Sequence, residues 1–258
     1  MASHPMFDIS GRIALVTGST RGIGLALARG LLEAGAIVVV NSRQHDQVAE
    51  RVDQLATEFG ADRVRGEAFD AAEPDEVRRA IDGIEDRLGP IEILVNNAGT
   101  QLRGDILDYT DSDWDAITRA NLDSVFVMSR EAGRRMAERG HGKIVNITSL
   151  QAQASRPGIA PYAATKGAVK MLTRGLAGDL ARRGVQVNAL GPGYFVTELN
   201  QGLRDDERFD SWLRDRTPAA RWGELDDLVG TLLYLVSPAS DFVNGQSVYV
   251  DGGILAVL

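Results

Sequence analysis

Residues 13–24 read IALVTGSTRGIG and pass from a predicted strand through a glycine-rich turn into a predicted helix. Ile13 to Val16 form an unbroken apolar run, as is typical of a strand that is buried on both faces of a sheet. The glycines that follow are spaced G-x-x-x-G-x-G, which lets the backbone turn sharply before the helix starts. The stretch therefore predicts the first strand–turn–helix unit of an α/β protein.

Short apolar runs and longer amphipathic segments alternate in the same way through the rest of the chain. Six more strands are predicted at residues 37–40, 64–69, 91–95, 144–147, 185–190 and 247–250. Helices are predicted at residues 24–34, 74–88, 111–138, 162–182 and 225–237. Because helical crossovers join parallel strands with one hand, the pattern predicts an α/β fold with a doubly wound parallel sheet and helices on both faces. No linker or repeat interrupts it, so residues 1–258 are expected to form a single domain.

The composition excludes several classes of function. A formal net charge of −8 argues against a nucleic-acid or anionic-membrane partner. The chain has no cysteine, and His4, His45 and His141 have no metal-ligand spacing, so neither a disulfide nor a metal site is expected. No apolar stretch approaches the ~20 residues that span a bilayer, and residues 1–8 lack the features of a signal peptide. We therefore expect a cytoplasmic protein.

The glycine turn is predicted to bind the phosphates of a dinucleotide. Backbone N–H groups and the positive dipole end of the following helix would point at a pyrophosphate, and glycine would let the ligand approach the backbone closely. A glycine-rich turn that binds no ligand is the alternative. The residues expected to contact the cofactor here are Gly18, Ser19, Thr20, Arg21, Gly22, Ile23 and Gly24.

The end of the second predicted strand distinguishes between two cofactors. NAD-binding proteins carry an acidic residue here, but this chain reads Ser42-Arg43 and has no carboxylate before Asp46. Arg43 can offer a planar guanidinium to a 2′-phosphate, and Ser42 a hydroxyl, so NADP(H) is favoured over NAD(H); a solvated surface arginine is the alternative. After the third strand, Asp70, beside Ala71, would either accept from the adenine amino group or cap the next helix.

A second group of residues indicates proton transfer. Tyr162 and Lys166 are four positions apart and share a helix face, and a nearby ammonium should lower the tyrosine pKa from its ordinary value of ~10. Ser149 follows the fifth predicted strand, where a parallel sheet places functional groups, and its hydroxyl would hold a reacting oxygen against Tyr162. Taken alone, Y-x-x-x-K also fits an ordinary amphipathic helix, and Ser149 also fits a turn.

The ordered set of motifs resembles the short-chain dehydrogenase/reductase family, from about residue 7 to the C-terminal end. It comprises Thr17-Gly18-x-x-x-Gly22-x-Gly24, Asn96-Asn97-Ala98-Gly99, Ser149, Tyr162-x-x-x-Lys166 and Pro192-Gly193. The resemblance implies a Rossmann-type sheet of about seven strands and an assembly of four or two copies. It implies further cofactor contacts at Asn97, Ala98, Gly99, Tyr162, Lys166, Pro192, Gly193, Phe195 and Thr197.

The same resemblance implies a catalytic tetrad of Asn121, Ser149, Tyr162 and Lys166. In that scheme Tyr162 is the acid or base, and Ser149 polarises the carbonyl. Lys166 binds the nicotinamide ribose, and Asn121 helps to hold a water that relays protons.

A narrower resemblance, to the gluconate 5-dehydrogenases of that family, rests on segments such as 97–103, 209–212 and 221–223. It implies NADP-dependent interconversion of D-gluconate and 5-keto-D-gluconate. A carboxylate with many hydroxyls requires an arginine and neutral polar groups in a partly closed pocket. The residues expected to contact such a substrate are Gln101, Arg103, Ser149, Gln151, Arg156, Tyr162, Tyr194 and Asn200; most of them would otherwise be surface loop residues.

Residues 191–223 break the strand–helix rhythm and carry several aromatic side chains among many charges. We expect a substrate lid at about residues 194–222; a pair of surface helices that pack their aromatics on the core is the alternative. Two other functions remain open. One is the reduction of a 3-oxoacyl thioester or another carbonyl compound, and the other is a non-catalytic dinucleotide-binding regulator, which intact Tyr162 and Lys166 disfavour.

Overall fold

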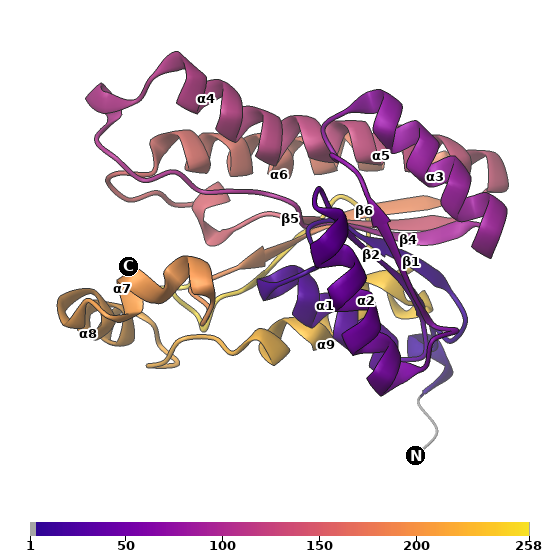
Figure 1. Cartoon of the computed structure of the whole chain (residues 1–258). Coiled ribbons are helices and arrows are strands. Elements are labelled where there is room, and N and C mark those ends of the chain that lie inside the picture. The colour runs from indigo at the N-terminus through magenta and orange to yellow at the C-terminus, as the bar shows by residue number, and fades with distance from the viewer. Residues whose placement is uncertain (1–3, 258) are drawn as a thin grey trace.

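The computed structural model describes residues 4–257, which fold around a parallel sheet of seven strands (Figure 1). The strand order is β3-β2-β1-β4-β5-β6-β7, and all neighbours are parallel. The order reverses beside β1, as in doubly wound sheets, so the predicted fold class is confirmed. The strands are β1 (Ile13–Val16), β2 (Ile37–Ser42), β3 (Val64–Ala68), β4 (Ile91–Asn96), β5 (Gly142–Ile147), β6 (Val185–Pro192) and β7 (Ser247–Val250).

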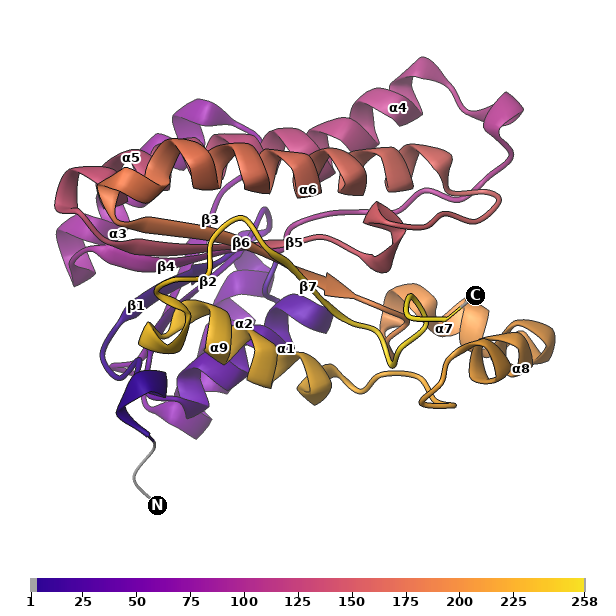
Figure 2. The same cartoon turned by 180° about the vertical axis from the view of Figure 1, so that it is seen from behind.

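Helices cover both faces of the sheet (Figures 1 and 2). One face carries α1 (Gly22–Glu33), α2 (His45–Phe59) and α9 (Val229–Val236). The other face carries α3 (Pro74–Leu88), α5 (Ser124–Arg139) and α6 (Ala160–Leu180). The remaining helices are α4 (Asp111–Thr118), α7 (Gln201–Arg204) and α8 (Glu207–Arg216).

Alternate residues of each strand enter two separate cores. Val38 and Val40 pack with Leu27 of α1 on one face, whereas Val39 packs with Val77 of α3 on the other. Successive side chains of a strand point to opposite faces, and both faces are covered here, which is why the strands read as unbroken apolar runs. Burial of one such side chain contributes about 1.5–3 kcal/mol.

Two helical segments differ from the prediction. The apolar pattern does not reveal α2, because only Val48 and Leu55 of its 15 residues are buried. The helix expected at residues 111–138 is interrupted by a π-helical turn at Arg119–Asp123, between α4 and α5. Such turns are rare and are frequently found at functional sites.

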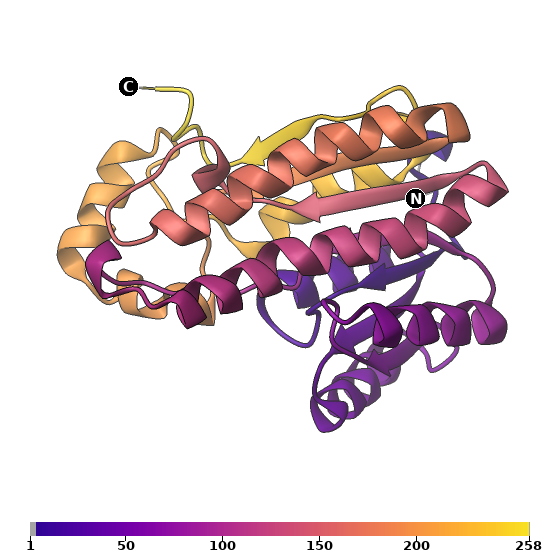
Figure 3. The same cartoon turned by 90° about the horizontal axis from the view of Figure 1, so that it is seen from above.

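Residues 194–222 lie beyond the carboxyl ends of the strands, where α7 and α8 (orange in Figure 3) extend past the sheet. A third apolar cluster joins Leu213 of α8 and Trp222 to Leu150 and Ile254. Leu150 follows β5, and Ile254 belongs to the C-terminal tail. The segment therefore packs at the edge of the sheet where the carboxyl ends of the strands collect.

Two kinds of feature are absent from residues 4–257. No helix in this range has both the length and the apolar character needed to cross a membrane. The same residues bring together no group of three or more His, Cys, Asp or Glu side chains that would hold a metal ion.

Two glycines at the amino edge of the sheet provide a test of the packing. Both Gly140 and Gly184 have positive φ, of 80° and 76°, but only a Cβ at Gly184 would collide, 1.9 Å from the Gly140 oxygen. Gly140→Ala should cost about 1–2 kcal/mol for the left-handed backbone. Gly184→Ala should cost about 1–3 kcal/mol more because it also overpacks the loop. Urea unfolding of both variants measures the difference, and equal losses would contradict the close approach of the two loops.

Candidate active site

The turn between β1 and α1 is held in place by side chains from two neighbouring strand ends. The Asn97 side-chain amide, after β4, donates to the carbonyls of Thr17 and Gly18, both at 2.9 Å. At the end of β2, the Asn41 side-chain oxygen accepts from the Gly18 N–H at 3.2 Å. A Cβ at Gly24 would lie 2.3 Å from the Asn97 amide nitrogen and 2.4 Å from the Gly18 oxygen. Glycine is therefore required at position 24.

The start of α1 has the features of a phosphate site. Arg21 is the N-cap residue but makes no side-chain capping hydrogen bond, and the Ser19 hydroxyl donates to the Val16 carbonyl at 2.6 Å instead. Gly22 has a φ of 56°, and a Cβ placed there would have no atom within 4 Å. This open helix start, next to a backbone that tolerates no side chain, fits a dinucleotide pyrophosphate.

The two residues predicted to select NADP(H) lie at the end of β2. Arg43 is exposed and pairs with no carboxylate within residues 4–257. The Ser42 hydroxyl accepts from the Gln44 N–H at 3.1 Å, which leaves its side chain at the surface turn beside Arg43.

Asp70 does not cap the helix that follows it. Its carboxylate accepts from the Ala72 N–H at 2.9 Å and from Arg119 at 3.0 Å. The N-cap residue of α3 is Glu73, so the cap predicted as one role of Asp70 is wrong. The adenine contact at Asp70 and Ala71 stays a prediction.

Three of the predicted catalytic residues meet where α6 lies against the end of β5. Tyr162 lies in the first turn of α6, where the Ser149 side chain is near enough to lower the pKa of its phenol. The Lys166 ammonium, one turn further on, donates to the Ile147 carbonyl at 2.8 Å. This bond ties α6 to the strand that leads into Ser149, and so brings the two hydroxyls together.

The π-helical turn adds Asn121 to the same group. Its side chain accepts from the Thr100 N–H at 2.7 Å and donates to the Thr100 carbonyl at 2.9 Å and the Thr165 hydroxyl at 3.2 Å. A Cβ on Gly99 would lie 2.9 Å from the Asn121 oxygen and 3.7 Å from the Lys166 nitrogen. The loop after β4 therefore runs between these two side chains.

Burial governs the titration of the two central groups. It raises the pKa of Tyr162 above 10.0, and the hydrogen bond with Ser149 and the charge of Arg103 oppose that rise. Burial also lowers the pKa of Lys166 to about 8. The Lys166 nitrogen lies 5.9 Å from the centroid of the Tyr162 ring. The expectation that Lys166 lowers the tyrosine pKa is therefore wrong for this structure, in which desolvation of the phenol prevails.

Polar side chains from three segments lie around the phenols of Tyr162 and Tyr194. Arg103 donates to the Gln101 oxygen at 3.0 Å and to the Asn200 oxygen at 3.1 Å. The Gln151 amide donates to the Tyr194 hydroxyl at 3.3 Å. The positive charge of Arg103 lowers the pKa of both Tyr162 and Tyr194. The structure thus brings together the side chains that the sequence predicted as substrate contacts.

Unpartnered polar atoms lie among these residues. The Gln151 side-chain oxygen and the Thr197 hydroxyl are buried and have no hydrogen-bond partner in the described part of the chain. Buried polar atoms normally have partners, so these two fit ligand contacts. Thr197 lies past Pro192 and Gly193, where the carboxamide of a nicotinamide is predicted to bind, and Phe195 nearby is buried.

An aromatic cluster, formed by Tyr194, Phe209, Trp212 and Trp222, gives residues 194–222 their internal structure. The Tyr194 ring is its centre, with ring centroids 5.5 Å, 6.4 Å and 6.0 Å from the other three in that order. The Trp222 ring nitrogen donates to Asp210 at 2.6 Å. The segment contains short helices whose aromatic side chains pack beside the site, and movement as a lid stays a prediction.

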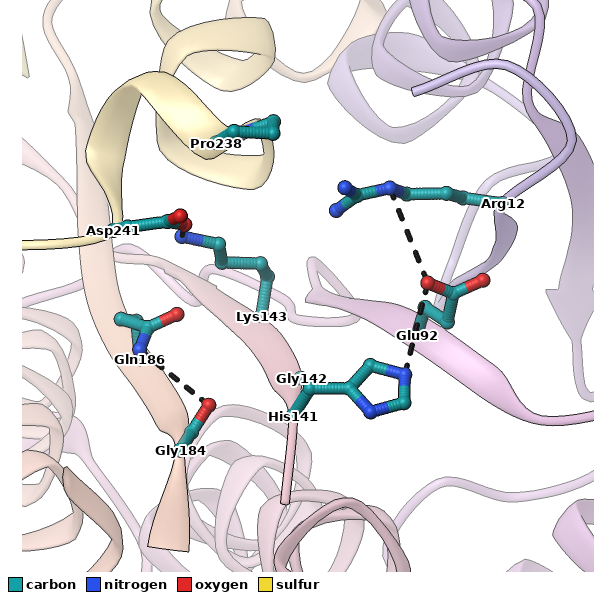
Figure 4. A pocket seen from close by; sticks show the side chains of 9 residues that line it. All are labelled: Arg12, Glu92, His141, Gly142, Lys143, Gly184, Gln186, Pro238 and Asp241. Atoms are coloured by element: carbon teal, nitrogen blue, oxygen red, sulfur yellow. Dashed lines mark hydrogen bonds and ion pairs between the residues drawn. The ribbon is translucent and has the colours of Figure 1, made fainter. Parts of the chain in front are cut away.

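A hollow of about 310 Å³ lies at the opposite, amino edge of the sheet (Figure 4). Arg12 and His141 approach Glu92 there, at 3.9 Å and 3.8 Å, and Lys143 donates to Asp241 at 2.8 Å. Its charges are paired within the protein, and none of the predicted catalytic residues lines it.

Comparisons with known proteins identify the family of the chain. A family model described as enoyl-(acyl carrier protein) reductase matches residues 18–255. The chain belongs to the short-chain dehydrogenase/reductase family, as its motifs predicted.

Relatives within that family cover the whole length of the chain. A gluconate 5-dehydrogenase of Gluconobacter oxydans is 49% identical over 99% of this chain and 100% of its own. A 5-keto-D-gluconate 5-reductase of Escherichia coli is 43% identical over 99% and 100%. The crystal structure of a gluconate 5-dehydrogenase from Burkholderia cenocepacia, in complex with NADP and tartrate, superposes with a TM-score of 0.95. It is 52% identical and matches 98% of this chain and 99% of that one.

The lowered pKa of Lys166 predicts a pH-dependent stability. The unfolded chain holds the Lys166 proton up to about pH 10.5, and the folded protein releases it near pH 8. The unfolded state therefore binds more protons between these values, and the free energy of unfolding should rise with pH across that window. At pH 7, Lys166→Met should stabilise the cofactor-free protein by about 1–3 kcal/mol, because it removes a buried charge. The gain should shrink as pH rises through 8.

Urea unfolding of wild type and variant at pH 7 and 9.5 checks this prediction. Lys170→Met, one turn later on α6, is the matched control, since the Lys170 ammonium bonds Gln153 at the surface. A difference between wild type and Lys166→Met that does not change with pH would refute the assignment of the pKa.

Proposed function

We propose that the protein is an NADP(H)-dependent oxidoreductase that interconverts D-gluconate and 5-keto-D-gluconate. The observation that carries the proposal is the placement of the Tyr162 phenol beside Ser149, Lys166 and Arg103. This arrangement offers a proton donor, a hydrogen-bond donor and a positive charge to one small anionic carbonyl compound. The names of the most similar relatives support the same substrate pair.

In the direction of reduction, Tyr162 protonates the carbonyl oxygen and Ser149 donates a hydrogen bond to it. The raised pKa of Tyr162 supports the acid role, because the phenol then keeps its proton at neutral pH. NADPH, when bound, supplies the hydride that reaches the carbonyl carbon. Lys166 binds the nicotinamide ribose, and Asn121 helps to hold a water that returns a proton to Tyr162.

The residues that would hold the cofactor form a continuous path along the carboxyl edge of the sheet. The glycine turn takes the pyrophosphate, Ser42 and Arg43 take the 2′-phosphate, and Thr197 takes the carboxamide. The unpartnered Thr197 hydroxyl and the open start of α1 support these roles. NADP in the crystal structure of the Burkholderia relative supports the choice of cofactor.

Assembly into homotetramers or homodimers is part of the proposal. Trp114 of α4, Phe126 of α5 and Met171 of α6 expose large apolar side chains on one helical layer. Exposed apolar side chains on adjacent helices are typical of contact surfaces. A cytoplasmic location is also proposed, since NADPH is a reductant of the cytoplasm.

Reduction of a 3-oxoacyl thioester is the second candidate function. The description of the matching family model, an enoyl-(acyl carrier protein) reductase, names the same class of thioester substrate, although such an enzyme reduces a C=C bond and not a carbonyl group. Such a substrate carries a long arm, whereas Arg103 donates to Asn200 across the site, which suits a short polar acid better.

Replacing the phenol tests the proposed reaction. Tyr162→Phe should lower kcat for 5-keto-D-gluconate by about 10²- to 10⁴-fold, the usual contribution of a general acid, while the Kd for NADPH stays within about threefold. NADPH absorbance and fluorescence titration give the two values, and Tyr234→Phe on α9 is the control. Wild type that reduces an acetoacetyl thioester but no keto acid would replace the proposed substrate with the second candidate.

Arg43 tests the proposed cofactor. Arg43→Ala should raise KM for NADPH about 10- to 100-fold, as expected for a lost charge-assisted contact, and change KM for NADH by less than about threefold. Arg87→Ala, at an arginine that pairs with Glu67, is the control. Steady-state rates with both cofactors check the prediction, and an equal effect on NADPH and NADH would exclude a contact with the 2′-phosphate.

A further inference from the structure

Arg156, in the loop between β5 and α6, is held beside the aromatic cluster. Its guanidinium carbon lies 5.6 Å from the centroid of the Phe209 ring on α8. The charge of the same group lowers the pKa of the Tyr194 phenol. Stacking on a ring face fixes the orientation of a planar cation. The Arg156 side chain is therefore positioned at the site and is not simply solvated.

The charge of Arg156 has no carboxylate partner in residues 4–257. One of its terminal nitrogens reaches the Pro157 carbonyl at 3.4 Å, and its Nε is buried without a hydrogen-bond partner in that range. The guanidinium of Arg103 is near enough for the charge of Arg156 to lower its pKa. A second positive charge placed beside Arg103 in a partly buried site is costly unless an anion pairs with it.

The two arginines have different surroundings: Arg156 stacks on Phe209 of the aromatic cluster, and Arg103 donates to Gln101 and Asn200. The charge that bears on Tyr162 is that of Arg103, whereas Arg156 bears on Tyr194 and on Arg103. In 5-keto-D-gluconate the carboxylate carbon is separated from the carbonyl carbon by four C–C bonds, roughly 5 Å when extended. A group that binds the carboxylate must therefore stand away from Tyr162, and Arg156, which stacks on Phe209, is the arginine of the two that does not affect the Tyr162 pKa.

Building on the proposed function, we infer that Arg156 binds the substrate carboxylate and makes the enzyme selective for sugar acids over uncharged ketoses. Phe209, on which Arg156 stacks, belongs to the aromatic cluster of residues 194–222. The carboxylate is therefore bound by the Arg156 guanidinium, whose orientation depends on Phe209 of α8. The sugar hydroxyls are left to the neutral side chains of Gln101, Gln151 and Asn200.

Two substrates that differ only at the acid end test the inference. L-Sorbose has the skeleton of 5-keto-D-gluconate with a hydroxymethyl group in place of the carboxylate. Arg156→Gln should lower kcat/KM for 5-keto-D-gluconate about 10- to 100-fold, as for a lost charge-assisted bond, and change the L-sorbose value by less than about threefold. Arg156→Lys keeps the charge and should recover part of the loss. D-Gluconate and D-glucitol, tested as inhibitors, provide the same comparison without turnover of an uncharged ketose.

A matched control separates charge recognition from a structural role. Arg130 also stacks over an exposed ring, with its guanidinium carbon 5.2 Å from the Phe126 centroid, but it pairs with Glu131. Arg130→Gln should leave both substrates unchanged. Equal losses on the charged and uncharged compounds in Arg156→Gln would overturn the inference, because Arg156 would then only support α8. Wild type that reduces other carbonyl compounds but not 5-keto-D-gluconate would instead count against the proposed function.

Discussion

The hydrogen bond from the buried Lys166 ammonium to the Ile147 carbonyl is the contact on which the site depends. It fastens α6 to the end of β5, and the residue that follows that strand end by two positions is Ser149. The Tyr162 phenol can therefore meet the Ser149 hydroxyl without any flexible connection between them. The arrangement has a cost, because an ammonium that burial drives to a pKa of about 8 destabilises the cofactor-free fold. Stability given up at a functional site is a common compromise in enzymes.

At the cofactor edge of the sheet, uncharged side chains also fix the backbone by hydrogen bonds. Asn97 and Asn41 replace the hydrogen bonds that the turn after β1 cannot make within a strand or a helix. They hold the turn so closely that glycine is required at position 24. The N–H groups at the start of α1 are thus left for a ligand, and their directions are set before the ligand arrives. Preorganised donors of this kind bind phosphate without the cost of reorganising the loop.

At the substrate edge, two arginines lie close together, and the Nε of Arg156 is buried without a hydrogen-bond partner in residues 4–257. The charge of Arg156 lowers the pKa of Arg103 and of Tyr194, the charge of Arg103 lowers that of Tyr162, and the aromatic cluster holds Arg156 through Phe209. A carboxylate would relieve that repulsion, so the same feature accounts for affinity and for selectivity. The paired charges of the hollow at the amino edge show the contrast, since there each cation already has an anion beside it.

The amino-acid sequence alone determined where the buried strands lie in the chain and which residues give the site its chemistry. Unbroken apolar runs predict buried parallel strands, and the spacing of Ser149, Tyr162 and Lys166 identifies the family, because both signals are local. Other features depended on contacts between distant segments. Asn41 and Thr165 were not among the predicted site residues, since a polar residue at a strand end or on a helix has no partner until the fold supplies one. The direction of the Tyr162 pKa was likewise decided by the tertiary structure, because desolvation depends on what surrounds the phenol and not on its neighbours in the chain.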